Sequence, residues 1–248
     1  MHFKIIKKDT KTRARIAEIT LNGRKIETPI FMPVATSAAI KGLHGKDLVD
    51  ASDSQIILAN TYHLYLRPGH DIIKNSGGIH NFMSWDRNVL TDSGGYQVYS
   101  LSDNRKIEED GVKFKSHIDG SYHFFSPEKA IQIQKSIGAD IIMAFDECTP
   151  YPCDKNYARK SMNLTHRWLQ RCIKEFKHGE NNNLREQFLF PIVQGSVYAD
   201  LRSESAEFVS SMDLPGNAIG GLSVGEPHDL MYETVSYTHL TLPTISVV

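Results

Sequence analysis

The sequence predicts an α/β fold, an incomplete TIM (β/α)8 barrel with about six of the eight strands. Short apolar runs recur from residue 30 onward and alternate with helical or mixed segments, which is typical of parallel βα units. The sequence has no Gly-x-Gly-x-x-Gly motif, which favours a barrel over a dinucleotide-binding fold. Because a closed barrel needs eight strands, we expect about a quarter of it to be missing at the C-terminal end.

An N-terminal antiparallel β segment is expected before the barrel strands. Residues 2–8 and 14–21 have strand-like patterns, and a third strand over residues 25–27 follows the Asn22-Gly23 pair. Asn-Gly between such patterns is a strong hairpin signal, because both residues tolerate positive φ.

Six apolar runs give the expected barrel strands, over residues 30–34, 55–59, 89–90, 140–145, 188–193 and 218–219. Helices are expected over residues 126–137, 157–177 and 199–211. The first of these has Ser126 as N-cap, Pro127 at the first helical position and Gly138 as C-cap. Residues 97–99 are predicted as a short β-like segment. An inserted hairpin follows, with strands over 112–118 and 122–125 joined by Asp119-Gly120.

The composition is that of an ordinary globular protein, with 248 residues, 40% hydrophobic and 23% charged residues. The net charge of −1 means that any basic surface for nucleic acid must be local. No apolar run reaches the length of a membrane span and residues 1–8 do not form a signal sequence, so we expect a cytoplasmic protein. Cys148, Cys153 and Cys172 form no metal-binding spacing, and we expect reduced thiols.

Polar residues follow four of the apolar runs, where a barrel carries its chemistry. Asp92 follows residues 89–90, Asp146 and Cys148 follow 140–145, and Gln194 follows 188–193. The glycine-rich segment 220–226 follows the last run. Singly, Asp146 is more often a cap or ion-pair partner, Gln194 a structural hydrogen bonder and Cys148 a buried filler. Their convergence on one rim favours a binding site.

Guanine fits such a rim. A carboxylate accepts two parallel hydrogen bonds, and guanine offers two adjacent donors, N1–H and its exocyclic amine. An amide side chain and a backbone N–H can donate to O6 and N7. Tyr96 could stack on the base, and Asp92 would remain for proton transfer.

These residues lie in long motifs that resemble the tRNA-guanine transglycosylases, the enzymes of queuosine modification. The similarity covers about residues 1–233 and rests on Phe31-Met32-Pro33-Val34, Leu58-Ala59-Asn60-Thr61-Tyr62-His63-Leu64, Arg67-Pro68-Gly69, Leu90-Thr91-Asp92-Ser93-Gly94-Gly95-Tyr96-Gln97-Val98, Phe145-Asp146-Glu147-Cys148-Thr149-Pro150, Ile192-Val193-Gln194-Gly195 and Gly220-Gly221-Leu222-Ser223-Val224-Gly225-Glu226.

The resemblance implies a pentosyltransferase that flips the wobble guanine out of a tRNA anticodon loop. An aspartate nucleophile attacks the ribose anomeric carbon, and 7-aminomethyl-7-deazaguanine then replaces guanine. The resemblance also implies a homodimer, with no membrane attachment. By it, Asp92 is the proton acceptor, and Cys148 and Val224 are similar to the bacterial type. The implied substrate-binding residues are Asp92, Ser93, Gly94, Gly95, Tyr96, Gln97, Asp146, Cys148, Gln194, Gly220, Gly221 and Leu222.

The sequence departs from the family pattern at its C-terminal end. The family's nucleophilic aspartate and its zinc site of three cysteines and one histidine are not found, and no Asp or Glu follows Glu233. We therefore expect residues 1–233 to be a truncated transglycosylase barrel domain. We interpret residues 234–248 as a non-family tail, an artefact of sequencing. The expectation is that this chain holds no cofactor and is catalytically inactive.

Two other functions remain open. The chain could be a non-catalytic partner subunit or guanine/tRNA-binding module of the same fold, or an unrelated barrel hydrolase with Asp92 and Asp146 as a carboxylate pair. Intact Asp92, Asp146 and Gln194 favour catalytic ancestry, and a hydrolase has no reason to bind guanine. We expect the most basic helix to be a solvated outer element rather than a tRNA surface; its cations are Lys155, Arg159, Lys160, Arg167, Arg171, Lys174 and Lys177.

Overall fold

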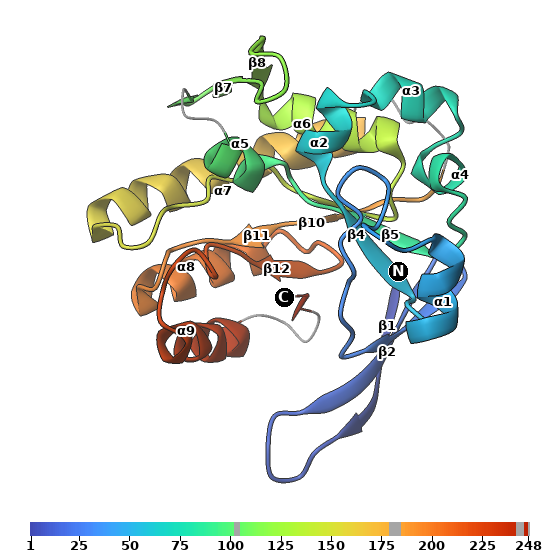
Figure 1. Cartoon of the computed structure of the whole chain (residues 1–248). Helices are drawn as coiled ribbons and strands as arrows, with labels where there is room; N and C mark the ends of the chain where they lie inside the picture. Colours follow the sequence, from blue (N-terminus) through green and yellow to red (C-terminus); the bar gives the residue numbers. More distant parts are fainter. Residues whose placement is uncertain (102–104, 179–184, 242–245, 248) are drawn as a thin grey trace. The chain divides into compact units, whose positions relative to one another are not determined.

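The computed structural model describes residues 1–101, 105–178, 185–241 and 246–247 (Figure 1). The chain forms two compact units. Unit 1 comprises Met1–Asp92, Ile133–Ile142 and Glu180–Phe188, and unit 2 comprises Ser93–Gln132, Met143–Gly179 and Leu189–Val248. In the described ranges no helix has the length and apolar character needed to cross a membrane.

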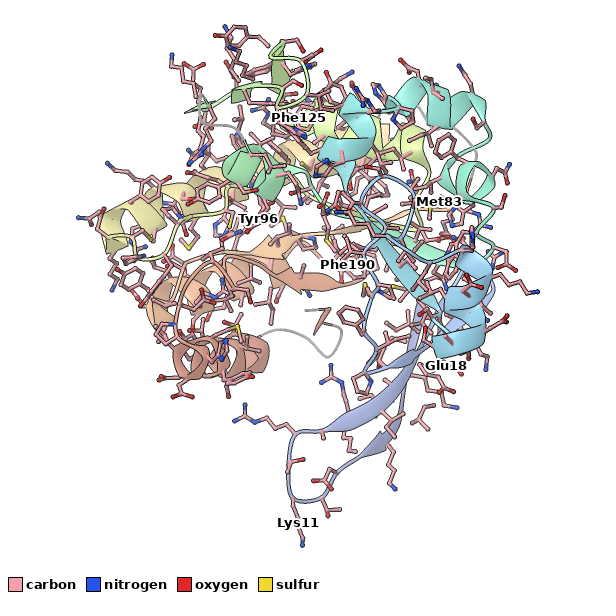
Figure 2. The ribbon with its side chains drawn as sticks, viewed as in Figure 1. Lys11, Glu18, Met83, Tyr96, Phe125 and Phe190 are labelled. Atoms are coloured by element: carbon pink, nitrogen blue, oxygen red, sulfur yellow. The ribbon has the colours of Figure 1, made fainter. Side chains whose placement is uncertain are left out.

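Unit 1 begins with the antiparallel sheet β1-β2-β3, formed by His2–Lys8, Arg15–Leu21 and Arg24–Thr28. Asn22 and Gly23 both have positive φ, 48° and 77°, so the predicted hairpin turn is confirmed. Lys11 lies in the loop at the far end of the β1–β2 hairpin (Figure 2). Alternate residues of β2 are buried, which gives this sheet one apolar face.

The second sheet is parallel, in the order β10-β9-β5-β4. Its strands are β4 (Ile56–Ala59), β5 (Asn88–Thr91), β9 (Ile141–Met143) and β10 (Phe188–Phe190). Thr91 is paired with Ala59 on one side and with Ile142 on the other. Asp92 therefore follows a strand with a neighbour on each side. Unit 1 also holds the helices α1 (Gly45–Ser52), α2 (Thr61–Leu66), α3 (His70–Asn75) and α4 (Ile79–Met83).

Unit 2 contains a third sheet, β11-β12-β13, formed by Ile192–Val193, Asn217–Ile219 and Ser246–Val247. Helix α8 (Ala199–Ser210) contacts α7 (Lys155–His178), β11 and α9 (His228–Thr241), and α8 and α9 lie side by side in Figure 1. The inserted segment forms β6 (Lys106–Glu108), β7 (Gly111–Lys115) and β8 (Tyr122–Phe125). Helices α5 (Gly95–Leu101) and α6 (Pro127–Ile137) flank it in the sequence.

The α/β class is confirmed, but the described parallel strands form two sheets rather than a closed barrel. The predicted strand over residues 188–193 is divided in two at Pro191, which has no N–H to donate to a neighbour. Residues 30–34 contribute only an isolated bridge, from Val34 to Leu58. The helix start at Ser126-Pro127 is confirmed, since Ser126 Oγ accepts a hydrogen bond from the Lys129 N–H at 3.1 Å.

The predicted β-like segment over residues 97–99 is wrong, because these residues belong to helix α5. Gly94 has a φ of 82° and ends the extended chain, and its carbonyl accepts the Val98 N–H at 3.2 Å. Three residues are too few for an apolar pattern to distinguish a strand from one helical turn.

Acids of unit 2 neutralise much of the basic helix α7. The pairs are Lys155 with Asp200, Arg159 with Glu204, Arg167 with Glu109 and Arg171 with Glu128, at 2.7 to 2.9 Å. Its opposite face buries Trp168, Met162 and Cys172. The charged side chains of this helix are therefore paired with acids and accessible to solvent, and its assignment as an outer element rather than a tRNA surface stays a prediction.

Asp140 is a buried polar centre of unit 1. Its Oδ2 lies 2.9 Å from His80 Nε2 and accepts the Val89 N–H at 2.8 Å; its Oδ1 accepts Nδ2 of Asn22 at 2.7 Å and Nη1 of Arg185 at 3.2 Å. Burial raises the pKa of this carboxyl, but the hydrogen bonds and charge around it, that of His80 foremost, hold the pKa below its usual value.

We predict that Asp140→Asn lowers the free energy of unfolding by about 3 kcal/mol at pH 7. Because the folded pKa of Asp140 lies below its ordinary value of 3.8, the stabilisation is complete above that value and is lost as the pH falls through the folded pKa. Urea unfolding at pH 7 and pH 3 should therefore show the difference between the two proteins shrinking in acid. The control is Asp53→Asn, whose exposed pair with Arg87 contributes at most about 1 kcal/mol. Equal losses for the two variants would contradict the account.

Candidate functional site

The candidate site of unit 2 is centred on Asp146, three residues beyond the end of β9. Parallel pairing continues after the strand, since the Ala144 N–H donates to the Phe190 carbonyl at 2.9 Å. Residues 144–149 are all buried, and Asp146 is only 8% exposed. A carboxylate at this depth needs hydrogen-bond donors.

An aromatic platform holds the backbone next to Asp146. The Phe145 ring stacks on Trp168, with centroids 5.0 Å apart, and meets Phe125 edge-on at 6.1 Å. The Phe145 N–H donates to Sγ of the buried Cys172 at 3.3 Å. Since these rings are almost inaccessible to solvent, the peptide that carries Asp146 has little freedom to move.

The side chains of Ser93 and Gln194 donate to the Asp146 carboxylate. Ser93 Oγ donates to Oδ1 at 2.6 Å, and Gln194 Nε2 donates to Oδ2 at 2.7 Å. Ser93 Oγ also accepts the Gly95 N–H at 3.0 Å. A Cβ at Gly95 would lie 2.5 Å from the Asp146 carbonyl oxygen, so only glycine permits this approach.

Gln194 is 1% exposed and is fixed from two directions. Its backbone N–H donates to Ser205 Oγ at 3.1 Å, and Ser205 Oγ lies 3.0 Å from His166 Nε2. Burial lowers the pKa of His166 to about 4, so the imidazole is neutral at pH 7. The Gln194 Oε1 atom is buried and finds no hydrogen-bond partner among the described residues.

The glycine turn after β12 lies against Gln194. The Gly220 N–H donates to the Val193 carbonyl at 3.0 Å, which continues the pairing of β11 with β12. Gly221 has a φ of 68°, and a Cβ there would lie 2.4 Å from Gln194 Oε1. Glu226 closes the loop by accepting the N–H groups of Ser223 and Val224. The sequence predictions for Gln194, Gly220 and Gly221 thus converge on one place.

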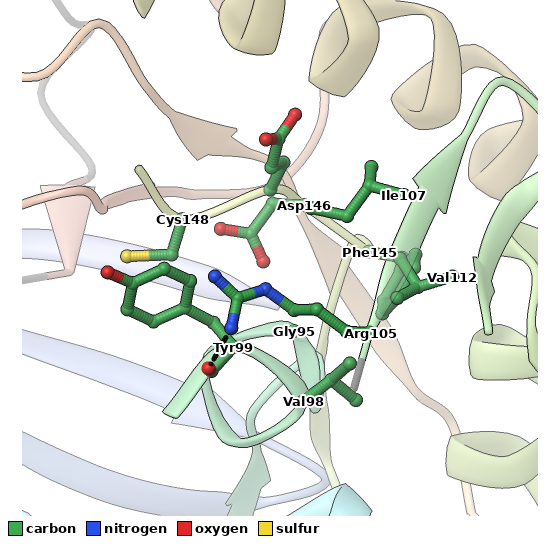
Figure 3. Close-up of a pocket in the computed structure, with 10 residues that line it drawn as sticks. Gly95, Val98, Tyr99, Arg105, Ile107, Val112, Phe145, Asp146 and Cys148 are labelled. Atoms are coloured by element: carbon green, nitrogen blue, oxygen red, sulfur yellow. Dashed lines mark hydrogen bonds between the residues drawn. The ribbon is translucent and has the colours of Figure 1, made fainter. Parts of the chain in front are cut away.

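A small recess that opens to solvent lies beside Asp146. At its wall, the Arg105 guanidinium carbon is 4.3 Å from the centre of the Tyr99 ring, and Nη1 donates to the Tyr99 carbonyl at 2.6 Å (Figure 3). The recess offers a ligand a cation, an aromatic ring and a carboxylate. Its lining is Gly95, Val98, Tyr99, Arg105, Ile107, Val112, Phe145, Asp146, Glu147 and Cys148.

Asp92 belongs to unit 1, and residues at the start of helix α2 donate hydrogen bonds to it. Asn60 Nδ2 donates to its Oδ2 at 2.5 Å and the Thr61 N–H donates to its Oδ1 at 2.8 Å. Thr61 Oγ1 also donates to the Asp92 carbonyl, at 2.5 Å. The carboxylate is therefore held in one orientation by the N-terminal end of a helix, where a negative charge is favoured.

The remaining predicted residues differ in their surroundings. Tyr96 is 48% exposed and lies 6.4 Å from the Tyr99 ring, so it is accessible for stacking. Gln97 Oε1 is buried without a partner among the described residues, and Leu222 is half-buried. Sequence reasoning assigned no role to Asn60, Thr61, Ser205 or Arg202. The first two lie inside a family motif, whereas the pair on α8 carried no sequence signal.

Across the described ranges, no three His, Cys, Asp or Glu side chains gather as a possible metal site. These residues therefore do not fit the zinc that the resemblance implies for the full-length family.

A family model described as queuine tRNA-ribosyltransferase matches residues 9–247. The chain belongs to this family. Proteins named queuine tRNA-ribosyltransferase are similar along almost the whole chain: that of Caldanaerobacter subterraneus subsp. tengcongensis is 57% identical over 97% of the chain, and that of Thermoanaerobacter sp. (strain X514) is 54% identical over 97%. The protein of that name from Symbiobacterium thermophilum is 53% identical over 98% of the chain.

The chain spans 63% of the length of the first two relatives and 59% of the third. The family match includes residues 234–247, so the division into a domain over 1–233 and a non-family tail stays a prediction.

We predict that Cys148 resists thiol reagents in the folded protein. Burial, and next the charge of Asp146, raise the pKa of its thiol to about 12, so the reactive thiolate is scarce at pH 8. Mass spectrometry after brief iodoacetamide treatment should show the half-buried Cys153 labelled first, with Cys148 and Cys172 at least about 100-fold slower. Cys153→Ser is the control and should leave only the slow labelling. Rapid labelling of Cys148 would contradict this picture of the site.

Proposed function

We propose that this chain is the purine-recognition part of a tRNA-guanine transglycosylase, which exchanges the wobble guanine of tRNA for 7-aminomethyl-7-deazaguanine in queuosine biosynthesis. The observation that carries the proposal is the buried Asp146 carboxylate, held between Ser93 and Gln194. Family membership supports the reaction class.

The guanine edge with two donors, N1–H and the 2-amino group, matches the two oxygens of Asp146. On the opposite edge, the Gln194 amide and the Gly221 N–H would donate to O6 and N7. The Gln194 amide now donates to Asp146, and guanine would replace it with donors of its own. This replacement of one hydrogen-bond donor by another keeps the buried carboxylate hydrogen-bonded, so guanine can enter without leaving an unpaired charge.

Asp92 would move the proton of the departing and incoming bases. Its orientation by Asn60 and Thr61 suits a fixed acid or base. We propose that the carboxylate that attacks the ribose anomeric carbon lies outside residues 1–248. It forms a bond to this carbon as the bond to guanine breaks, and these 248 residues therefore bind the base without exchanging it.

Tyr96 is accessible to stack on the base, and Cys148 and Val224 support the bacterial substrate. The partner would be the anticodon loop of tRNA, with a homodimer and a completed barrel as in the family.

The first test is a change of base preference. Asp146→Asn replaces one acceptor by a donor, which suits xanthine, with N1–H beside a carbonyl at position 2, better than guanine. Calorimetry should show guanine affinity falling about 10- to 100-fold while xanthine affinity rises. Asp200→Asn, an exposed acid of the same unit, should change neither affinity. The proposal is contradicted if the protein binds no guanine, or if Asp146→Asn lowers the affinities for guanine and xanthine equally.

The second test separates binding from chemistry. In the whole protein that carries this chain, Asp92→Asn should lower the rate of labelled guanine exchange into tRNA at least about 100-fold. Guanine affinity should stay within about threefold, because Asp92 handles the proton and Asp146 reads the edge. Unchanged exchange by Asp92→Asn would contradict the proton-transfer role of Asp92.

A further inference from the structure

Arg202 is a buried cation of helix α8 that the proposed function does not use. Its side chain is 0% exposed, and within the described ranges it has no carboxylate in a salt bridge. Burial lowers its pKa to about 10, so the guanidinium is still charged at pH 7. Burying a charged guanidinium costs free energy unless its N–H groups make hydrogen bonds. The acceptors of these N–H groups therefore indicate what Arg202 does.

The guanidinium joins the ends of two neighbouring strands. Nη1 donates to the Gly220 carbonyl at 2.6 Å and to the Val193 carbonyl at 3.3 Å, while Nε donates to Thr238 Oγ1 at 3.1 Å. Val193 precedes Gln194, and Gly220 precedes Gly221. The Val193 carbonyl shares a peptide unit with the Gln194 N–H, and the Gly220 carbonyl shares one with the Gly221 N–H. Arg202 therefore binds both of these peptide units through their carbonyls.

A peptide unit is rigid and planar, so a cation on its carbonyl fixes the direction of its N–H. Donation to the carbonyl also polarises the unit and makes the N–H a stronger donor. For the Gly220–Gly221 unit, that N–H is the proposed donor to the purine. A Cβ on Gly221 would lie 2.4 Å from Gln194 Oε1 and 3.7 Å from Arg202 Nη1. Gln194 Oε1 and Arg202 Nη2 are both buried and without a partner among the described residues.

We infer that Arg202 is a positioning residue: by holding the Val193–Gln194 and Gly220–Gly221 peptide units, it sets the Gln194 side-chain amide and the Gly221 N–H against the purine edge that carries O6 and N7. This inference rests on the proposed function. It predicts that Arg202 affects one edge of the base and leaves the edge at Asp146 alone.

The test compares Arg202→Met and Arg202→Lys with the unchanged protein by calorimetry. 6-Thioguanine weakens the acceptor at position 6 and keeps both donors, whereas hypoxanthine lacks only the 2-amino group. We expect the preference for guanine over 6-thioguanine to fall at least fivefold in Arg202→Met and less in Arg202→Lys. The preference for guanine over hypoxanthine should stay within twofold.

Val209→Ala is the control, because Val209 is a buried residue of the same helix and contacts none of these carbonyls through a side-chain hydrogen bond. It should lower the melting temperature and leave both preferences unchanged. Equal loss of both preferences in Arg202→Met would make Arg202 merely structural and overturn the inference. If the unchanged protein binds no guanine, the proposed function fails instead.

Should neither Arg202 variant fold, NMR of the unchanged protein decides. Guanine binding should shift the Arg202 side-chain nitrogen resonances and slow the exchange of its protons. Unchanged resonances in a guanine-saturated protein would overturn the inference.

Discussion

The structure of unit 2 depends on one buried carboxylate, that of Asp146. Its desolvation requires donors, and Ser93 and Gln194 supply them from two distant segments of the chain. Each donor needs glycine nearby: Gly95 allows the turn of Ser93 to approach Asp146, and Gly221 leaves room for the Gln194 amide. Because the aromatic stack of Phe145 on Trp168 fixes the same backbone, the polar centre and the apolar core constrain each other.

The two strongly held aspartates outside this centre have different surroundings. Asp140 is closed off by four donors and serves stability. Asp92 is oriented by Asn60 and the first N–H of a helix, at the point where the chain passes from unit 1 to unit 2. Asp146 sits at the wall of a recess and shares its carboxylate with an amide. A closed ion pair stabilises, whereas a carboxylate whose donors can be exchanged for those of a ligand can recognise it.

The sequence predicted the features that a few adjacent residues determine, such as a turn or the start of a helix. Asn22-Gly23 specifies its turn through positive φ, and Ser126-Pro127 specifies a helix start. It failed for residues 97–99, where three residues allow a strand or a helical turn, and for residues 188–193, where Pro191 divides the strand. The contact of Gln194 with Asp146 joins residues 48 positions apart, and no local pattern encodes it. Arg202 was missed because a basic residue on a helix is usually solvated.

The role of Asp146 is tested most directly by a crystal structure of the protein with guanine. We expect one Asp146 oxygen to accept N1–H and the other to accept the 2-amino group, each within about 3.2 Å, and the Gln194 amide to have turned from Asp146 to the base. Guanine bound away from Asp146, or bound there while Gln194 still donates to the carboxylate in place of the base, would contradict the account.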